Sequence, residues 1–128
     1  MSPKQELLLA AKAVGYKIDG YVEKVGFYHL DGIIVSGRLW NPLVNNEDAF
    51  QLALTLGISI EVNASIETGT FAYQGVTEGE YALGIEAWHV RQDGTVIKSA
   101  RVYSDQNIKT DSARKAIVDV AVQLGKLK

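Results

Sequence analysis

Three chemical groups close together before a proline could form a ligand site. Arg38 supplies a planar, permanently charged guanidinium, Trp40 a large aromatic surface and Asn41 an amide beside Pro42. Together they could hold a planar anion, with Trp40 stacking on it and Arg38 pairing with its charge. The same residues have a structural interpretation, in which Trp40 packs at the start of a helix and Asn41 closes a turn. The sequence leaves both interpretations open.

A second set of basic and aromatic residues falls on the two arms of one predicted hairpin. His89 and Arg91 lie on the first arm and Arg101 on the second, with Trp88 and Tyr103 beside them. A sheet face that carries such residues can bind bases or nucleotides. It can equally form an oligomer interface, because Trp, Tyr and Arg are enriched there as well.

The start of the last predicted helix adds one more basic residue. Thr110 and Ser112 offer hydroxyls near free N–H groups that can hold an anion, and Arg114 or Lys115 could add charge. Asp111 gives the alternative of an ordinary helix cap. The predicted ligand-binding residues are therefore Arg38, Trp40, Asn41, His89, Arg91, Arg101 and Arg114.

No established catalytic or metal-binding pattern is present in the sequence. The absence of cysteine excludes a disulfide scaffold, a thiolate zinc site and a cysteine nucleophile. His29 and His89 do not define a metal site, and the glycine patterns of nucleotide-binding loops are missing. Ser36, His89 and Asp93 could be written as a triad, but no nucleophile elbow supports it. Three carboxylates that could be drawn as a glycosidase pair are more simply surface groups: Glu78, Glu80 and Glu86. We therefore predict no catalytic residue, no metal and no cofactor.

Charge is distributed unevenly, although the formal net charge is only −2. Residues 98–128 hold seven basic and three acidic side chains, a net +4, which leaves −6 on residues 1–97. The basic segment could attract an anionic ligand, and the acidic remainder could dock on a protein. A solvated helix face is the simpler interpretation of the basic segment. The surface as a whole is not that of a nucleic-acid-binding protein.

Three amphipathic helices are predicted to position these groups. The first begins at the N-cap Ser2, with Gln5 completing a capping box. The second begins after Asn45 and Asn46, and the third at residues 110–111. Apolar residues at helical spacing give each helix a buried stripe, which includes Leu52 in the second. Each helix is expected to end at a glycine: Gly15, Gly57 and Gly125.

Alternating apolar and polar residues predict the strands between the helices. Six strands are expected, at residues 25–30, 33–35, 58–64, 68–74, 81–91 and 95–103, with a loop at residues 74–80. Asp31-Gly32 and Asp93-Gly94 predict two hairpins. The order α-β-β-α-β-β-β-β-α predicts a single α+β domain over residues 1–128. It would hold a mainly antiparallel sheet of five to six strands with three helices packed on it.

Two parts of the chain carry a resemblance to a known group of proteins. Trp40-Asn41-Pro42 precedes a helix containing Asp48-Ala49, and the closing helix contains Arg114-Lys115-Ala116-Ile117-Val118. These residues resemble small bacteriophage proteins of the NinX-like group, over about residues 38–57 and 105–125. The resemblance implies a phage accessory protein made in the bacterial cytoplasm. It implies no activity and no catalytic residues.

These observations lead to three functional hypotheses. The first is a non-enzymatic phage accessory protein that binds and inhibits a host protein, such as one of a defence system, in the host cytoplasm. The alternative is a protein that sequesters a small anionic, nucleotide-like signalling molecule, and the second alternative is an enzyme with an unrecognised site. We expect a homo-oligomer, because hairpins leave exposed strand edges. We expect no membrane span, because no segment approaches ~18 apolar residues, and no secretory signal, because Lys12 interrupts the first apolar run.

Overall fold

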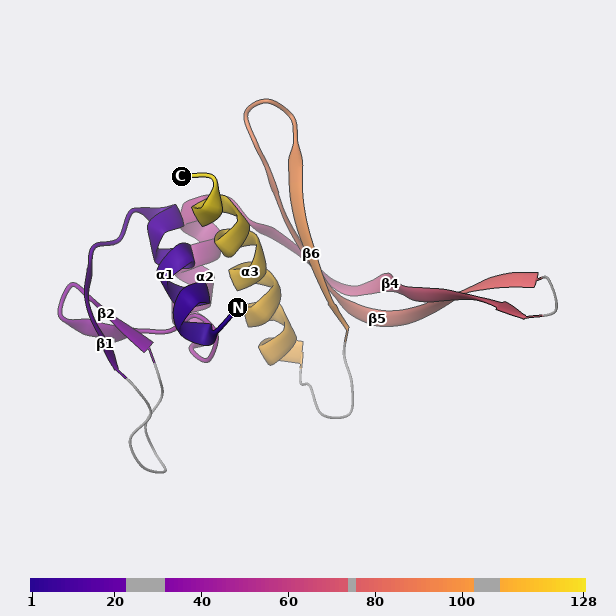
Figure 1. The fold of residues 1–128 in the computed structure, drawn as a ribbon, viewed down its shortest axis with the longest axis horizontal. Coiled ribbons are helices and arrows are strands. Elements are labelled where there is room, and N and C mark those ends of the chain that lie inside the picture. The colour runs from indigo at the N-terminus through magenta and orange to yellow at the C-terminus, as the bar shows by residue number, and fades with distance from the viewer. Residues whose placement is uncertain (23–31, 74–75, 103–108) are drawn as a thin grey trace.

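Three helices and two small antiparallel sheets make up the computed structural model of this chain (Figure 1). The structure describes residues 1–22, 32–73, 76–102 and 109–128, with the side chains of residues 63, 65–83 and 102 left out of the description. The elements follow in the order α1 (Pro3–Val14), β1 (Ile18–Val22), β2 (Gly32–Val35), β3 (Arg38–Trp40), α2 (Asn46–Leu56), β4 (Ser59–Tyr73), β5 (Val76–Val90), β6 (Val96–Val102) and α3 (Lys109–Lys126).

The ends of the first two helices are those predicted from the sequence. The Ser2 side chain accepts a hydrogen bond from the Gln5 N–H, and the Gln5 side chain accepts one from the Ser2 N–H, so the capping box is complete. Asn45 caps α2 in the same way, by accepting from the Asp48 N–H. Gly15 and Gly57 both end their helices in the left-handed conformation that glycine adopts without strain. Helix-end chemistry is local, and the sequence was sufficient to predict it.

The third helix does not end where the sequence predicts. It continues past Gly125 to Lys126, and Gly125 is buried inside it. A Cβ atom at Gly125 would lie 2.0 Å from the backbone oxygen of Leu9 on α1. The glycine is therefore needed for the close crossing of α1 and α3, and it does not terminate α3.

The first sheet has the order β1-β2-β3 and differs from the predicted hairpin. Gly32 is the first residue of β2 and pairs with Val22, so it is a strand residue. Asp31 and the strand predicted at residues 25–30 lie outside the described residues. The tight turn of this sheet instead joins β2 to β3 through Ser36 and Gly37, which have φ values of 52° and 77°. Such a pair of positive φ values is typical of a two-residue hairpin turn.

The second sheet has the order β4-β5-β6 and confirms the hairpin predicted at Asp93-Gly94. The Arg91 N–H donates to the Thr95 carbonyl, and Gly94 closes the turn with a φ of 89°. Strands β4 and β5 have 15 residues each. The strands predicted at residues 58–64 and 68–74 form one strand, β4. The loop predicted at residues 74–80 is wrong for residues 76–80, which belong to β5, and its residues 74–75 lie outside the described residues. The two arms pair from Ser59 and Trp88 out to Tyr73 and Val76.

The prediction of one sheet with five to six strands is wrong, because the strands form two separate sheets. Figure 1 shows the helices between them: β1-β2-β3 lies beside α1 at one end, and β4-β5-β6 lies beside α3 at the other. Strand β3 is only three residues long and leads directly into the loop before α2, so it offers little edge for pairing. The α+β class, the three helices and the antiparallel pairing are confirmed.

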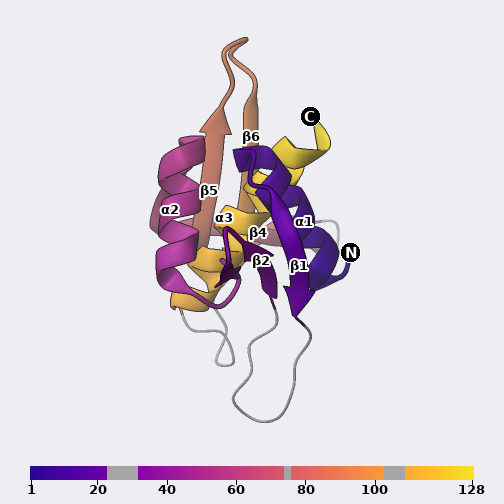
Figure 2. The same cartoon turned by 90° about the vertical axis from the view of Figure 1, so that its left-hand side faces the viewer.

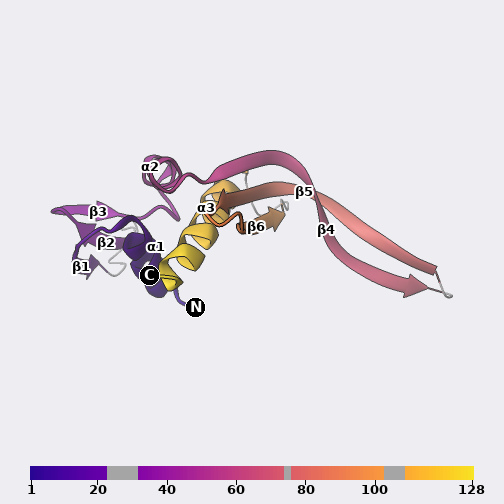
Figure 3. The same ribbon diagram turned by 90° about the horizontal axis from the view of Figure 1, so that it is seen from above.

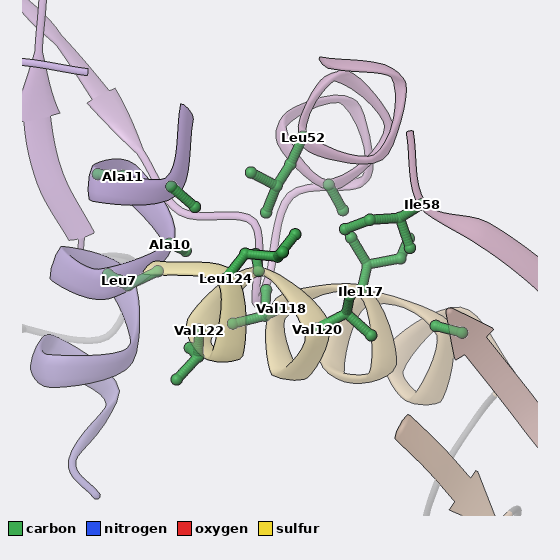
Figure 4. Packing of buried hydrophobic residues seen from close by; sticks show 14 of the residues in the cluster. Leu7, Ala10, Ala11, Leu52, Ile58, Ile117, Val118, Val120, Val122 and Leu124 are labelled. Carbon is green, nitrogen blue, oxygen red and sulfur yellow. The ribbon is translucent and has the colours of Figure 1, made fainter. Parts of the chain in front are cut away.

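The core lies where the three helices meet. In Figure 2 α3 lies between α1 and α2, and it contributes the largest share of the buried side chains. Figure 4 shows Val118 and Leu124 of α3 near Leu52 of α2, with Leu7 of α1 on the other side. Ile33 of β2 and Ile85 of β5 extend this cluster into both sheets. Within the described residues, no helix is both long and apolar enough to cross a lipid bilayer.

Candidate functional site

A buried carboxylate holds together the loop that contains Trp40, Asn41 and Pro42. Asp48, in the first turn of α2, accepts from the Arg38 guanidinium at 3.1 Å and from the Asn41 backbone N–H at 2.9 Å. Asp48 is only 3% exposed, so its bond to Asn41 is shielded from water, whereas the Arg38 side chain at the other bond is 64% exposed. The Asn41 side chain in turn accepts from the Leu43 N–H at 3.0 Å. Arg38 and Asn41 therefore serve the junction between β3 and α2.

Arg114 closes this junction from the α3 side. Its Nε donates to the Leu43 carbonyl at 2.9 Å, and its terminal nitrogens donate to the side chains of Asn46 and Asp111. The side chain of Arg114 is 14% exposed. Arg114 lies in the second turn of α3, and these three acceptors hold its positive charge near the helix start. An anion bound at the start of α3, as the sequence analysis considered, would have to compete with these three acceptors for Arg114.

Trp40 is placed away from solvent, which corrects its interpretation as a stacking platform. It is 1% exposed and meets the Tyr16 ring edge-on, with 5.6 Å between ring centroids. A buried indole of this size contributes packing and cannot accept a planar ligand on its face without opening the core. The structural interpretation of the Trp-Asn-Pro element is the one that the geometry favours.

The three remaining candidate residues lie on the second sheet, in two places. Arg101 makes two hydrogen bonds of 2.7 Å to the carboxylate of Asp119 on α3, and this contact raises the pKa of Arg101. The same carboxylate accepts from the Ser99 hydroxyl. Arg101 therefore fastens β6 to α3.

His89 and Arg91 lie at the end of β5, beside the turn to β6. His89 Nδ1 is 3.3 Å from the Gly57 carbonyl at the end of α2, and Arg91 is 3.9 Å from the Asp93 carboxylate. These residues line a shallow hollow of about 410 Å³ with Gln92. Hydrogen bonds from Thr95 lower the pKa of Asp93, so a carboxylate charge stands in the hollow and disfavours an anion there.

The seven candidate residues thus fall in three places. Arg38, Trp40, Asn41 and Arg114 come together around the start of α2, whereas Arg101 faces α3 and the pair His89 and Arg91 lies at the β5–β6 turn. Four of the seven make contacts that position backbone or secondary structure. The fold therefore does not bring all seven residues together around one ligand.

The face of the β4-β5-β6 sheet that no helix covers carries a group that the sequence analysis did not bring together. Cross-strand pairing puts Ser59, Trp88 and Lys98 in one row, with Glu61 and Glu86 in the next row. The far row is the pair Val90 and Val96, 57% and 46% exposed. We call this surface the open face; it has a shallow hollow of about 350 Å³, lined by Glu61, Glu86, Trp88, Val90, Val96 and Lys98.

The alternation in residues 81–91 was a usable signal for half of the open face, since it separated Glu86 and Trp88 from Ile85 and Ala87. Ile85 and Ala87 are 1% and 0% exposed and face α3. What the alternation could not show is which residues of β4 and β6 stand beside Trp88, because strand register is a property of the folded sheet. Tyr103, the second aromatic residue proposed near this hairpin, lies outside the described residues.

Two arrangements weighed in the sequence, a metal site and a Ser-His-Asp triad, can be compared with the described residues. They contain no group of three or more metal-ligating side chains. Ser36 lies in the β2–β3 turn of the first sheet, whereas His89 and Asp93 belong to the second sheet. His29 lies outside the described residues.

Comparisons with known proteins found no matching family model, no similar curated protein and no similar solved structure.

Proposed function

We propose that this chain is a non-enzymatic accessory protein that binds a protein of a bacterial host and thereby inhibits it. Its docking element is the β4–β5 hairpin together with the open face of its sheet. The phage setting of the proposal comes from the resemblance of the Trp-Asn-Pro element and the closing helix to the NinX-like proteins. Binding does not require a catalytic group, and a docked partner can be inhibited simply by being covered.

The observation that carries the proposal is the length of the hairpin. Figures 1 and 3 show β4 and β5 extending together far beyond the helices, so that none of the other described elements lies beside their outer halves. A two-stranded ribbon is marginally stable in water by itself. An arm of this length adds little to the core, and the backbone edge of the outer part of β5, beyond its pairing with β6, is suited to a protein partner.

The charges of the hairpin support a protein partner over an anion. Residues 39–90 contain seven acidic residues and no lysine or arginine. This segment includes α2, β4 and β5, so the whole arm is acidic. An acidic surface attracts basic protein surfaces and repels phosphates.

The alternative function, sequestering a small anionic nucleotide, has less support from the geometry. The guanidinium groups of Arg38, Arg101 and Arg114 are each bonded to a carboxylate of the chain. Trp40 is buried. A nucleotide would have to displace these contacts, and each displacement leaves a carboxylate without its partner.

Site-specific photo-cross-linking in bacterial cells tests the proposal. A benzophenone amino acid at Val90, on the open face, is expected to give one discrete adduct with a host protein. The matched control has the same amino acid at Gln123, an exposed position of α3, and is expected to give none. The cross-linked protein is then purified and titrated with the chain, and its activity is measured at increasing ratios.

A shortened hairpin provides the decisive comparison. Gly69 pairs with Glu80, so residues 70–79 can be replaced by Asn-Gly, which forms a two-residue turn. The shortened chain is expected to bind the purified partner at least about tenfold more weakly. Equal affinity for the two chains, or adducts of the chain with itself alone, would contradict the proposal.

A further inference from the structure

The open face has the chemistry to hold a positively charged side chain. Glu61 and Glu86 are directly opposed across β4 and β5. Two like charges in that position destabilise a sheet unless a cation lies between them. Glu86 has Lys98 at 3.7 Å, a long contact from a lysine whose side chain is 63% exposed. Among the described residues, no ion pair with Glu61 is formed.

Trp88 supplies the second half of this chemistry. Its partners across the strands are Ser59 and Lys98, and Glu61 is one step away on the neighbouring row. Trp88 is half-buried, so part of its indole remains exposed at the hollow, next to the exposed pair Val90 and Val96. An indole face attracts a guanidinium or an ammonium, and carboxylates beside it fix the orientation of the cation.

We propose that the open face binds an arginine side chain carried on an extended, basic segment of the partner protein. The guanidinium stacks on Trp88 and donates to the carboxylate of Glu61, and the aliphatic part of the same segment covers Val90 and Val96. The inference rests on the proposed function and names the chemistry of its partner. Arginine is preferred over lysine because its planar fork can stack and donate to a carboxylate at the same time.

Charge complementarity decides between this occupant and others. Among the described residues that line the hollow, Lys98 is the one basic group, against the two carboxylates of Glu61 and Glu86. A nucleic acid or nucleotide would place phosphates against Glu61 and Glu86. If a second copy of this chain occupies the open face, the Trp88 signal will shift as the protein concentration rises without peptide, and the test below measures this.

The two tryptophans of the chain make the test specific, because only one of them lies on the open face. With ¹⁵N-labelled protein, the indole N–H signals of Trp88 and Trp40 are followed during a titration with the peptide acetyl-Thr-Arg-Thr-Arg-Thr-amide. The Trp88 signal is expected to shift saturably, while the signal of Trp40, which is 1% exposed, stays in place. The same peptide with citrulline for arginine keeps the shape and removes the charge, and it should bind about tenfold more weakly.

Variants locate the binding. Glu61→Gln should weaken binding of the arginine peptide about tenfold. Glu47→Gln removes one charge from an exposed position in the first turn of α2 and should change the affinity less than about twofold. Trp88→Leu should weaken binding about threefold, and Trp40 fluorescence then reports that the variant is folded.

Three results would overturn the inference. These are equal binding of the arginine and citrulline peptides, equal losses in Glu61→Gln and Glu47→Gln, and no shift of Trp88 at millimolar peptide. A Trp88 shift that grows with protein concentration alone would assign the open face to a second copy and would also overturn it. The cross-linking at Val90 can still give a host adduct in the first three cases, so failure of the arginine site is distinguishable from failure of the proposed function.

Discussion

At the scale of single residues, several charged side chains of this protein join secondary-structure elements to one another. Asp48 bonds Arg38 and Asn41, Asp119 bonds Arg101, and Arg114 bonds the loop before α2. These residues looked like ligand-binding groups in the sequence because Arg and Asn serve both purposes. Their bonding partners in the folded chain show which purpose the fold uses.

The first prediction concerns Asp48. Asp48→Asn removes the charge from two bonds in a site that is 3% exposed, so the free energy of unfolding should fall by about 2 kcal/mol. Urea denaturation measures the loss. Glu47→Gln, one residue away but exposed, should change stability by less than about 0.5 kcal/mol. Equal effects of the two substitutions would mean that Asp48 acts only through the helix dipole.

The pH dependence of α3 gives a second prediction. The hydrogen bond from Lys115, assisted by the charges of Lys115 and Arg114, lowers the pKa of Asp111 from its ordinary 3.8. A lowered pKa in the folded chain stabilises it above pH 3.8, and this contribution is lost as the pH falls through the folded value. Asp111→Asn should therefore be less stable than the natural chain near neutral pH, and the gap should close in acid. A gap that stays constant down to about pH 3 would refute this origin.

At the scale of elements, packing between helices and the length of one hairpin are the distinguishing features. Helices α1 and α3 cross so closely at Gly125 that the backbone of Leu9 occupies the space of a side chain. Strands β4 and β5 reach away from that core (Figure 3). The close helix crossing is expected to contribute strongly to the stability of the fold, whereas the outer part of the hairpin is expected to contribute little.

Gly125→Ala tests the helix crossing. Alanine is favoured over glycine in a helix by about 1 kcal/mol, so propensity alone predicts a more stable variant. The added Cβ would lie 2.0 Å from the Leu9 backbone oxygen, and backbone atoms cannot move aside as a side chain can. We expect a net loss of at least about 2 kcal/mol in denaturant unfolding. Gln123→Ala, on the exposed side of the same helix, removes only a 3.3 Å hydrogen bond to the Lys98 carbonyl and should cost less than about 0.5 kcal/mol.

Shortening the hairpin tests whether the outer part of β4 and β5 contributes little to stability. Replacing residues 70–79 with Asn-Gly removes strand pairs that no other element covers (Figure 1). Because an isolated ribbon contributes little, the free energy of unfolding should change by less than about 1 kcal/mol. Calorimetry or urea denaturation measures it. A large loss of unfolding free energy would show that the arm stabilises the core. Its length would then no longer be an argument for a docking role.

At the scale of the whole molecule, β4 is a 15-residue edge of its sheet. Ile60 and Val62 on this strand are 43% and 50% exposed. Their register partners Ala87 and Ile85 are buried. An exposed edge with apolar side chains favours pairing with a second chain, and a two-fold axis at β4 would pair the strand with its own copy.

We therefore expect a homodimer through β4, with the open face left uncovered in each copy. Light scattering at micromolar concentration measures the mass. Val62→Lys should shift the equilibrium to the monomer, because charge on an edge strand opposes pairing. Leu54→Lys, at another exposed apolar residue but on α2, should not. A monomer in the natural chain would end this prediction.

The sequence by itself determined what depends on neighbouring residues. The caps Ser2 and Asn45, the left-handed Gly15 and Gly57 and the turn at Gly94 follow from local backbone chemistry, and the structure confirms them. The stripe of α2 was also predictable, since its spacing is that of a helix. These features involve residues within a few positions of one another.

Only the tertiary structure decided what depends on residues far apart in the chain. Trp40 is buried in the core with Tyr16 packed edge-on against it, Gly125 is required because Leu9 crosses it, and Arg101 is engaged because Asp119 lies opposite. The division into two sheets and the meeting of Glu61, Glu86 and Trp88 on one face have the same cause. Spacing along the chain reports local geometry, whereas strand register and helix crossings are set by the packing of the whole core.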